Sequence, residues 1–437
     1  METEYDDAEV RHRITEFLGG PSLEEAKCVF LVGYGPAGEA HGPAPPSVLP
    51  DWLEQGLDVR RSLWDRGSLL AVLDIGYVDF DRPAEAGLDR QRVSALLEPV
   101  AAAAGAILAE HGIVALHLRS GRGHQLVWRI RRGSRAFARL ASAGQVPPRL
   151  RELYARPHPP SDEPVPREMG AAYAALALVM ELVAHRIKRK AAPLCTVPVE
   201  ITNLAVGPGE RGREMISIDL SGYADPLSAR TLRVPFTGLD GAPEPAAGTC
   251  CLIPDAAEGM ERLVDYYRAS ALSQFHTWFY SQEPAPPPEL DETSALLELE
   301  RLPPCARTIL SCPGGLLSAS SGVERVTRVL LSFGWHPRHI AGLVRSRYER
   351  TGPWGEGWNA RDPGSLADFY VRLFSGLFFV GTDDLVSFNC QSARESGFCF
   401  HPVCSCNLLD YRGPLLERRA HGRLARRPLD RVVGGEE

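Results

Sequence analysis

Residues 69–80 read LLAVLDIGYVDF, an apolar run interrupted only by Asp74, Gly76 and Asp79. A short run of this kind predicts a buried β-strand. Downstream, the pattern predicts a helix over residues 90–110, with a break at Pro99, and strands over residues 113–118 and 124–130. A long apolar helix over residues 169–190 and two strands within residues 200–237 follow. This alternation predicts an α+β domain.

The length of 437 residues is enough for two or three domains. Residues 281–294 (SQEPAPPPELDETS) form the best linker candidate, because proline runs resist packing. We therefore expect an α/β domain over residues 1–280, a Pro-rich linker over 281–299 and a helical domain over 300–411. The Arg-rich tail, residues 412–437, is expected to be partly disordered.

The composition is that of a soluble globular protein, with 44% hydrophobic and 24% charged residues. It excludes disordered, collagen-like and coiled-coil proteins. The net charge of −7 gives no overall basic excess, so a nucleic-acid-binding surface would have to be local. The acidic start lacks an apolar segment of the secretory type, so a cytoplasmic protein without a membrane partner is expected. Disulfides are rare there, and the ten cysteines point to metal or packing.

Cysteines gather near the end of the chain. Residues 388–406 read FNCQSARESGFCFHPVCSC and contain Cys390, Cys399, Cys404 and Cys406, while Cys305 lies in LPPCARTILSC. Thiolates are ligands for zinc and for iron–sulfur clusters. The CxxC spacing usual in structural zinc sites is absent from the sequence.

This pattern resembles the iron–sulfur domain of the large subunit of archaeal and eukaryotic DNA primases, over about residues 300–410. In that family, a Pro-Pro-Cys at a helix start is followed by two cysteines about eight residues apart and then by one more. The resemblance implies a 4Fe–4S cluster held by Cys305, Cys390, Cys399 and Cys404. Zinc remains an alternative to the cluster, and Cys406 an alternative to Cys404.

With that resemblance in place, GYVDFD, SGRGHQ and ISID, in this order, resemble the motifs of archaeo-eukaryotic primase catalytic domains. The resemblance implies a sheet like that of RNA-recognition motifs. It also implies that Asp79, Asp81 and Asp219 hold two Mg²⁺ or Mn²⁺ ions for nucleotidyl transfer. A second register is open, in which Asp74 is the first acid and Gly76 stands where the family has another acid.

The same resemblance suggests a nucleotide-binding surface around the glycine turn and a later basic segment. In place of the family's histidine, this chain has Gln125. Arginines that follow the turn and cations at residues 186–190 are candidates for template contacts, although the latter also suit a helix C-terminus. The expected nucleotide-binding residues are Ser120, Gly121, Arg122, Gly123, His124, Gln125, Arg129, Arg230 and Arg233.

The expected function is therefore template-directed nucleotidyl transfer on single-stranded DNA, with NTP or dNTP as substrate. A replication protein or helicase is a candidate partner. One alternative is a catalytically degenerate primase-like protein that binds nucleic acid. Another is a zinc-stabilised structural protein.

Overall fold

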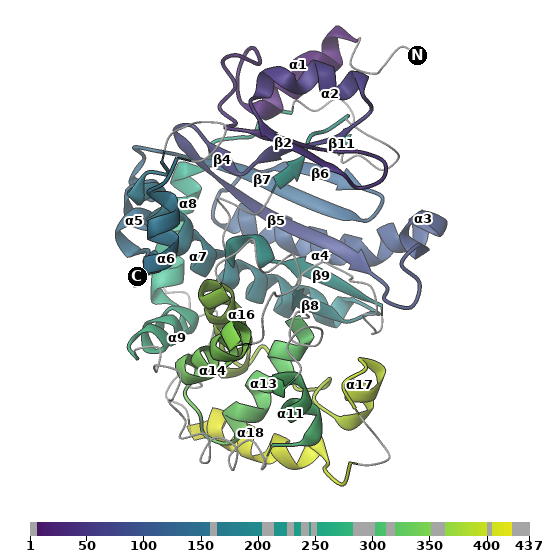
Figure 1. Cartoon of the computed structure of the whole chain (residues 1–437), viewed down its shortest axis with the longest axis vertical. Helices are drawn as coiled ribbons and strands as arrows, with labels where there is room; N and C mark the ends of the chain where they lie inside the picture. The colour runs from purple at the N-terminus through teal and green to yellow at the C-terminus, as the bar shows by residue number, and fades with distance from the viewer. Residues whose placement is uncertain are drawn as a thin grey trace, which may run out of the picture. The chain divides into compact units, whose positions relative to one another are not determined.

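The computed structural model describes residues 7–157, 164–202, 214–224, 231–236, 244–245, 251–282, 302–311, 320–350, 363–399 and 404–421. The chain divides into two compact units. The sheet unit comprises Met1–Val78, Ala84–Ile201 and Met215–Asp265, and the helical unit comprises Asp79–Pro83, Thr202–Glu214 and Tyr266–Glu437. Helices and an antiparallel sheet are both present (Figure 1), so the predicted α+β class is confirmed.

A seven-stranded sheet is the frame of the sheet unit. Its order is β11–β6–β7–β5–β9–β8, and β4 pairs with β5 off this path. β5 pairs antiparallel with both β7 and β9, and β7 pairs antiparallel with β6. The central place of β5 explains why its sequence is apolar on both faces. The strands are β4 (Trp64–Asp65), β5 (Ser68–Val78), β6 (Leu116–Ser120), β7 (Gly123–Arg131), β8 (Val199–Thr202), β9 (Met215–Asp219) and β11 (Glu244–Pro245).

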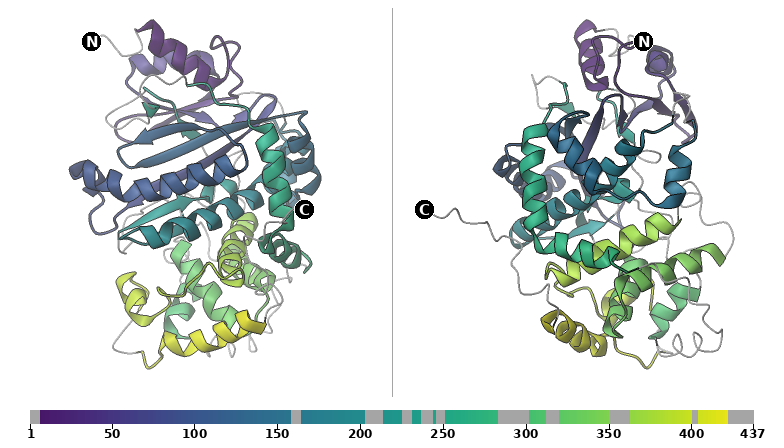
Figure 2. Two further views of the ribbon diagram at one scale, coloured as in Figure 1. Left: turned by 180° about the vertical axis from the view of Figure 1, so that it is seen from behind. Right: turned by 90° about the vertical axis from the view of Figure 1, so that its left-hand side faces the viewer.

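Two long helices, α4 (Arg90–Glu110) and α7 (Arg167–Ala191), lie side by side against one face of this sheet (Figure 2). α4 continues through Pro99, where the sequence predicted a break. Proline removes one hydrogen bond, but the apolar side chains on both sides of it are buried, and this packing holds the helix together. By length and hydropathy, α4 and the segment Arg167–Leu194 would also suit a membrane span. The window in the latter is 78% buried inside the protein, as in a core helix.

A smaller sheet, of order β10–β3–β1–β2, covers part of the opposite face of the large sheet. It packs together with α1, and their shared core includes Phe17, Leu31, Val72 and Val127. Its elements are α1 (Ala8–Leu18), β1 (Leu31–Tyr34), β2 (Ala40–Ala44), η2 (Pro46–Val48), α2 (Leu49–Glu54), β3 (Asp58–Ser62) and β10 (Thr231–Arg233). The rest of the sheet unit contains α3 (Glu85–Leu88), α5 (Arg135–Ala143), α6 (Pro148–Tyr154), η3 (Ala192–Leu194) and η4 (Ser221–Ala224).

The helical unit is built around α13, α14 and α16, which pack against one another. Arg328 on α13 donates to both carboxylate oxygens of Asp383, at 2.9 and 2.7 Å. α8 (Ala257–Ala269) runs from the sheet unit into this unit. The remaining elements are α9 (Ala271–Tyr280), α11 (Pro304–Ser311), α13 (Ser320–Ser332), α14 (Pro337–Arg350), α16 (Pro363–Phe379), α17 (Cys390–Glu395), η5 (Leu408–Tyr411) and α18 (Arg412–His421).

The ends of this unit differ from the sequence expectation in two places. α9 precedes the predicted linker, yet it belongs to the helical unit, and residues 283–299 of the linker lie outside the described part of the chain. The first ten residues of the predicted tail form α18. Arg418 anchors this helix by donating to the carbonyl oxygens of Leu331 and Trp335, at 2.9 and 2.8 Å. These contacts are tertiary, so the tail composition alone does not predict them.

Candidate functional site

Asp74 and Asp219 lie directly opposite each other on β5 and β9. On the other side of β5, Gln125 of β7 is the partner of Asp74, and its Nε2 donates to Asp74 Oδ2 at 3.3 Å. Asp219 is 6% exposed, and its Oδ1 accepts a hydrogen bond from the backbone N–H of Ser221 at 2.7 Å. Partners across strands project to the same face of a sheet. Gln125, Asp74 and Asp219 therefore form a row across three strands, which we call the acid row.

The acid row begins where the core beneath the small sheet ends. Val72 and Val127, the preceding pair on this face, belong to that core. Beyond the row, Gly76 of β5 is flanked by Gly123 and Ser217. The position two residues after Asp74, where a second carboxylate would face the same way, thus carries no side chain.

Of the two registers that the sequence left open, the structure has the one that pairs Asp74 with Asp219. β5 ends at Val78, so Asp79 and Asp81 follow the strand. Asp79 Oδ1 accepts hydrogen bonds from the backbone N–H groups of Asp81 and Arg82, at 3.0 and 2.9 Å. Asp79 thus closes the turn after the strand, and Asp81 is exposed in that turn.

The SGRG segment forms the turn between β6 and β7. Ser120 Oγ donates to the carbonyl oxygen of Gly123 at 3.3 Å, and the N–H of Arg122 lies 3.3 Å from Ser120 Oγ. A Cβ on Gly123 would lie 2.1 Å from the carbonyl oxygen of Ile75. Gly123 is therefore required for the close approach of β7 to β5, and this structural reason accounts for the glycine without a bound nucleotide. Gly121 lies at the tip, where a Cβ would meet only Arg90 Nε, at 4.0 Å.

His124 faces away from the acid row, as the strand alternation predicts. Its Nδ1 lies 2.7 Å from Nε2 of His117 on β6. Burial, together with the nearby His117 and Arg119, lowers the pKa of His124 to about 4. His124 therefore forms a neutral pair with His117 on the other face of the sheet.

Arg129 shares a face with Gln125 but does not reach the acid row. Its Nε donates to Asp65 Oδ2 at 3.1 Å, and Arg61 binds the other oxygen of the same carboxylate. Both arginines and Asp65 are buried, with exposures of 5% or less. Arg129, one of the expected nucleotide-binding residues, therefore lies in a buried ion pair with Asp65.

The basic segment after the third acid belongs to the small sheet. Arg233 lies on β10 and forms an ion pair with Asp58, with 2.5 Å between Nε and Oδ1. It is therefore not in the sheet that carries the acid row. Arg230 lies outside the described residues.

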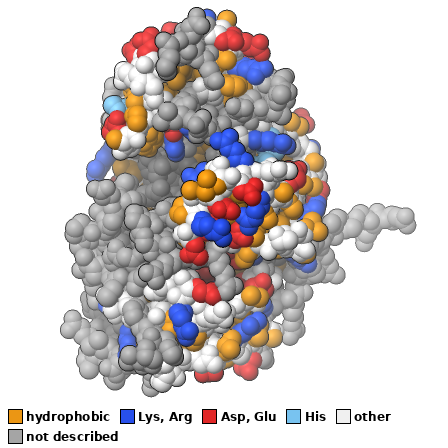
Figure 3. All heavy atoms as spheres, turned by 90° about the vertical axis from the view of Figure 1, so that its right-hand side faces the viewer, with side chains coloured by type: hydrophobic (Ala, Val, Ile, Leu, Met, Phe, Trp, Pro, Cys, Tyr) orange, Lys and Arg blue, Asp and Glu red, His pale blue; other side chains and the backbone are white. Residues whose placement is uncertain are grey.

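The two basic clusters near α5 and at the end of α7 are largely neutralised by carboxylates. Figure 3 shows the face on the right-hand side of Figure 1, where basic and acidic side chains are also interspersed, whereas α5 lies on the left in Figure 1. Pairing of this kind weakens both clusters as template-binding surfaces. The pairs are Arg131–Asp255, Arg132–Glu168, Arg135–Glu261, Arg139–Asp265, Arg186–Glu110, Lys188–Glu200 and Lys190–Glu110.

Several polar residues are buried although the sequence analysis did not single them out. Asp65 and Arg61 are wholly buried, and so are Glu181 and His185 on α7. The last two are four residues apart in an otherwise apolar stretch, which places them on one face of the helix and is the signal that could have found them. Asp65 has no comparable signal, because its partners lie on other strands.

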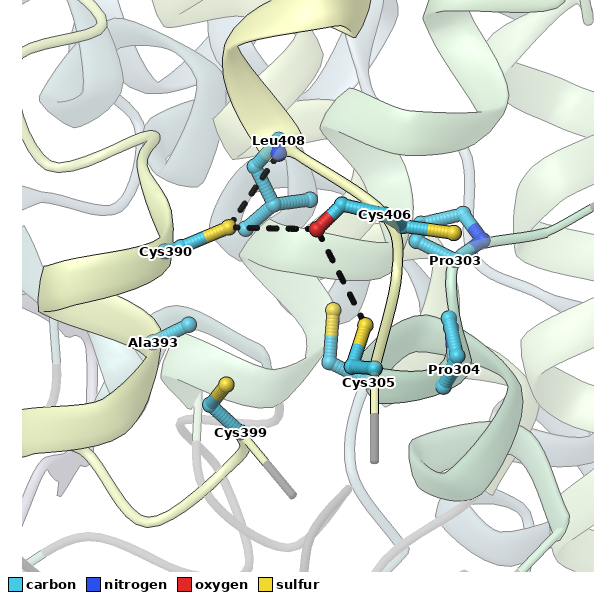
Figure 4. A pocket seen from close by; sticks show the side chains of 9 residues that line it. Pro303, Pro304, Cys305, Cys390, Ala393, Cys399, Cys406 and Leu408 are labelled. Atoms are coloured by element: carbon cyan, nitrogen blue, oxygen red, sulfur yellow. Dashed lines mark hydrogen bonds between the residues drawn. The ribbon is translucent and has the colours of Figure 1, made fainter. Parts of the chain in front are cut away.

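A pocket in the helical unit gathers the cysteines that the spacing and the resemblance pointed to (Figure 4). Its lining consists of Pro303, Pro304, Cys305, Cys390, Ala393, Cys399, Cys404, Cys406 and Leu408. Pro304 starts α11, so Cys305 lies in the first turn of that helix. Cys390 is the first residue of α17, whose N-cap is Asn389. Two helix starts thus present thiols to one pocket.

Cys404 and Cys406 both line the pocket. The sulfurs of Cys390 and Cys404 each lie 3.8 Å from the carbonyl oxygen of Cys406, and the N–H of Leu408 donates to Cys390 Sγ at 3.3 Å. In Figure 4, the sulfur of Cys390 points toward Leu408 and the carbonyl oxygen of Cys406. Cys404 and Cys406 therefore both remain candidates for the fourth ligand.

The donor set fits a metal group bound by thiolates. Burial raises the pKa of the Cys305 thiol to about 11, with Arg325 acting in the opposite direction, so a metal would have to displace its proton. Among the described residues, no three His, Cys, Asp or Glu side chains are grouped closely enough to hold one metal ion. The thiols line one pocket, and thiolates bind both zinc and iron–sulfur clusters.

The other cysteines that the structure describes are not part of the lining of this pocket. Cys28 and Cys251 are buried in the sheet unit, and Cys195 is half-buried after η3. Cys250 and Cys312 lie outside the described residues. Comparison of the chain with protein-family models, with curated proteins and with solved structures finds no match.

Proposed function

We propose that this protein is a primase-like nucleic-acid-binding protein whose carboxylate site is incomplete. The topology supports the primase-like part of this proposal. In chain order, the central elements are β5, α4, β6, β7, α7 and β9, and their order in the sheet is β6–β7–β5–β9. This β-α-β-β-α-β arrangement is that of split βαβ folds, to which RNA-recognition-motif-like sheets belong.

The observation that carries the proposal is the composition of the acid row. Asp74 and Asp219 are opposite each other, Gln125 stands in the histidine position, and Gly76 stands in the position of the second strand acid. Nucleotidyl transfer uses two divalent ions to clamp the attacking and leaving oxygens. Each ion needs several hard oxygen ligands. Two facing carboxylates supply too few oxygen atoms to hold two divalent ions. The residues of the row do not fit two ions, and we derive no catalytic step through them.

The β6–β7 turn offers a surface for phosphates. Arg119 and Arg122 are exposed on this hairpin, and exposed Arg90 approaches its tip at Gly121. Arg119 is the partner of His124 and lies on the face opposite the acid row. Arginines bind phosphate oxygens with two parallel hydrogen bonds. Single-stranded nucleic acid is the expected ligand, because a local basic turn can follow one backbone.

The cysteine pocket supports the second part of the resemblance, a 4Fe–4S cluster bound by Cys305, Cys390, Cys399 and Cys404. Such a cluster would contribute folding free energy to the helical unit and could exchange single electrons. Zinc in the same pocket is the alternative, and iron and sulfide analysis of anaerobically purified protein separates the two.

A primer-synthesis assay on anaerobically purified full-length protein tests the proposed function. We expect the protein to bind single-stranded DNA but to synthesise no primers with Mg²⁺ or Mn²⁺. The double variant Gly76→Asp/Gln125→His restores the missing groups and is expected to gain metal-dependent synthesis. Gly76→Asn/Gln125→His is the matched control, because it has the same size without the charge.

DNA binding is tested separately by fluorescence anisotropy. Arg119→Gln should weaken binding and reduce the slope of log affinity against log salt by about 0.7 for a lost phosphate contact on a single strand. Arg135→Gln, whose arginine already pairs with Glu261, should change neither. Primer synthesis by the unmodified protein that disappears in Asp74→Asn would establish the active primase instead. Absence of DNA binding would reject both functions.

A further inference from the structure

Arg325 is a buried cation at the cysteine pocket. It lies on α13, is 7% exposed, and its guanidinium carbon lies 5.2 Å from the ring centre of Phe398, the residue before Cys399. Its Nε and Nη1 are buried and make no hydrogen bond to any described residue. A charged group removed from water without a partner is costly, so this position calls for a nearby negative charge.

Arg328, a second buried arginine on the same helix, is bound by carboxylates and serves as a comparison for Arg325. Arg328 is 6% exposed, and it binds both oxygens of Asp383 and one oxygen of Glu324. Its charge is therefore balanced by carboxylates. Among the described residues, no carboxylate forms a hydrogen bond with Nε or Nη1 of Arg325, although Glu324 is close enough to act on it electrostatically.

The pocket beside Arg325 is lined by thiols. Arg325 lies on α13, which packs against α11, the helix that carries Cys305. Its guanidinium lies over the ring of Phe398, and the next residue, Cys399, lines the pocket. A metal group bound by thiolates in this pocket would therefore place negative charge near Arg325.

We propose that Arg325 is the counter-charge of a redox-active iron–sulfur cluster held by the cysteine pocket, and that it raises the reduction potential of that cluster. This inference rests on the cofactor given above as part of the proposed function. Reduction by an electrode adds one electron and makes the thiolate-bound cluster more negative by one unit. A buried cation beside two ligand sulfurs stabilises that state more than the oxidised one, because net charge around a cluster sets its potential. Arg325 is a positioning residue in this scheme and donates no electron.

The test is a potentiometric titration of the full chain after anaerobic reconstitution. At a fixed electrode potential, Arg325→Gln should change the ratio of oxidised to reduced cluster at least tenfold in favour of the oxidised form. For a one-electron couple, this equals a fall of 59 mV. Arg325→Lys keeps the charge and should retain most of the unmodified potential.

Arg307→Gln is the matched control, because Arg307 also lies near the pocket but is exposed on α11. Solvent screens its charge, so its removal should shift the potential far less. If Arg325→Gln binds a full complement of iron at an unchanged potential, the inference is wrong. If Arg325→Gln does not fold, the test rests on Arg325→Lys. A tenfold change in the ratio of oxidised to reduced cluster in that variant, which keeps the positive charge, would also refute the role of charge.

Metal analysis separates this inference from the proposals before it. A chain that binds zinc alone rejects both the cluster and the role of Arg325. That result would leave the expected DNA binding at the β6–β7 turn untouched, because the anisotropy measurement does not involve the pocket.

Discussion

Asp65 holds two guanidinium groups inside the sheet unit. It accepts from Arg61 and Arg129, and Ser68 Oγ donates to it at 2.9 Å. The carboxylate lies on β4, while the arginines come from β3 and β7. This one side chain therefore ties the small sheet to the large one.

Replacing Asp65 by asparagine should destabilise the sheet unit by about 3–5 kcal/mol, because two buried arginines lose their counter-charge. Urea denaturation followed by the fluorescence of Trp64 and Trp128 measures this loss. Glu168→Gln, which breaks the exposed pair with Arg132, should cost less than about 1 kcal/mol. Equal effects of the two substitutions would contradict a structural role for the buried pairs.

The His117–His124 pair makes stability depend on pH. The pKa of His124 is lowered to about 4 in the folded protein, against about 6.5 in the unfolded chain. Between these values the unfolded chain binds more protons, so the free energy of unfolding falls as pH drops from about 6.5 to 4. His124→Gln should flatten that dependence by about 1–2 kcal/mol over this window, as measured by urea titrations at several pH values. His12→Gln, at an exposed position, is the control.

At the level of elements, the end of β5 decides the candidate site. Three acids, Asp74, Asp79 and Asp81, were available for its motif. Alternation alone could not choose among them, because an apolar strand can end at either of two places. The side chain of Asp79 ends the strand, because it accepts hydrogen bonds from the backbone N–H groups of Asp81 and Arg82. Such local hydrogen bonds compete with hydrogen bonds between strands, and the hydrophobic pattern does not reveal them.

Other parts of the site were easier to predict from the sequence. The β6–β7 hairpin follows from its glycine turn between apolar strands. Cys390, Cys399 and Cys404 lie within a short segment, so their convergence follows from spacing, whereas Cys305 came only from a resemblance. The position of Arg129 could not be predicted, because the carboxylate that binds it lies on another strand pair.

Two helix starts and one loop build the cysteine pocket. Substitution of its cysteines should therefore affect iron binding to different degrees. Serine in place of Cys305, Cys390, Cys399 or Cys404 should abolish iron binding and lower the melting temperature of the helical unit, because the cluster contributes to its folding. Cys406→Ser should retain iron, because the resemblance assigns the fourth ligand position to Cys404. Iron and sulfide content, with visible absorption, measures both. Cys195→Ser is the control, and loss of iron in Cys406→Ser alone would exchange the roles of Cys404 and Cys406.

At the level of the whole molecule, the linker region predicts where the chain is most easily cut. Limited proteolysis should first cleave within residues 281–294, since a proline-rich sequence resists packing into a folded core. Mass spectrometry of the first products locates the cut. First cleavage within residues 70–130 would show that the predicted domain boundaries are wrong.

The place of α9 gives such a cut an unusual outcome. Its Phe275 ring stacks on Phe379 of α16 at 5.7 Å, and Trp278 meets His336 edge-on at 4.2 Å. A protease acting after residue 281 would leave α9 attached to the amino-terminal piece while its aromatic side chains stay seated in the other piece. The nicked chain should then elute from gel filtration as a single particle and separate only in denaturant. Equally, the two pieces produced from separate genes should reassemble, and a carboxy-terminal piece begun at residue 300 should need α9 supplied in trans to stay in solution.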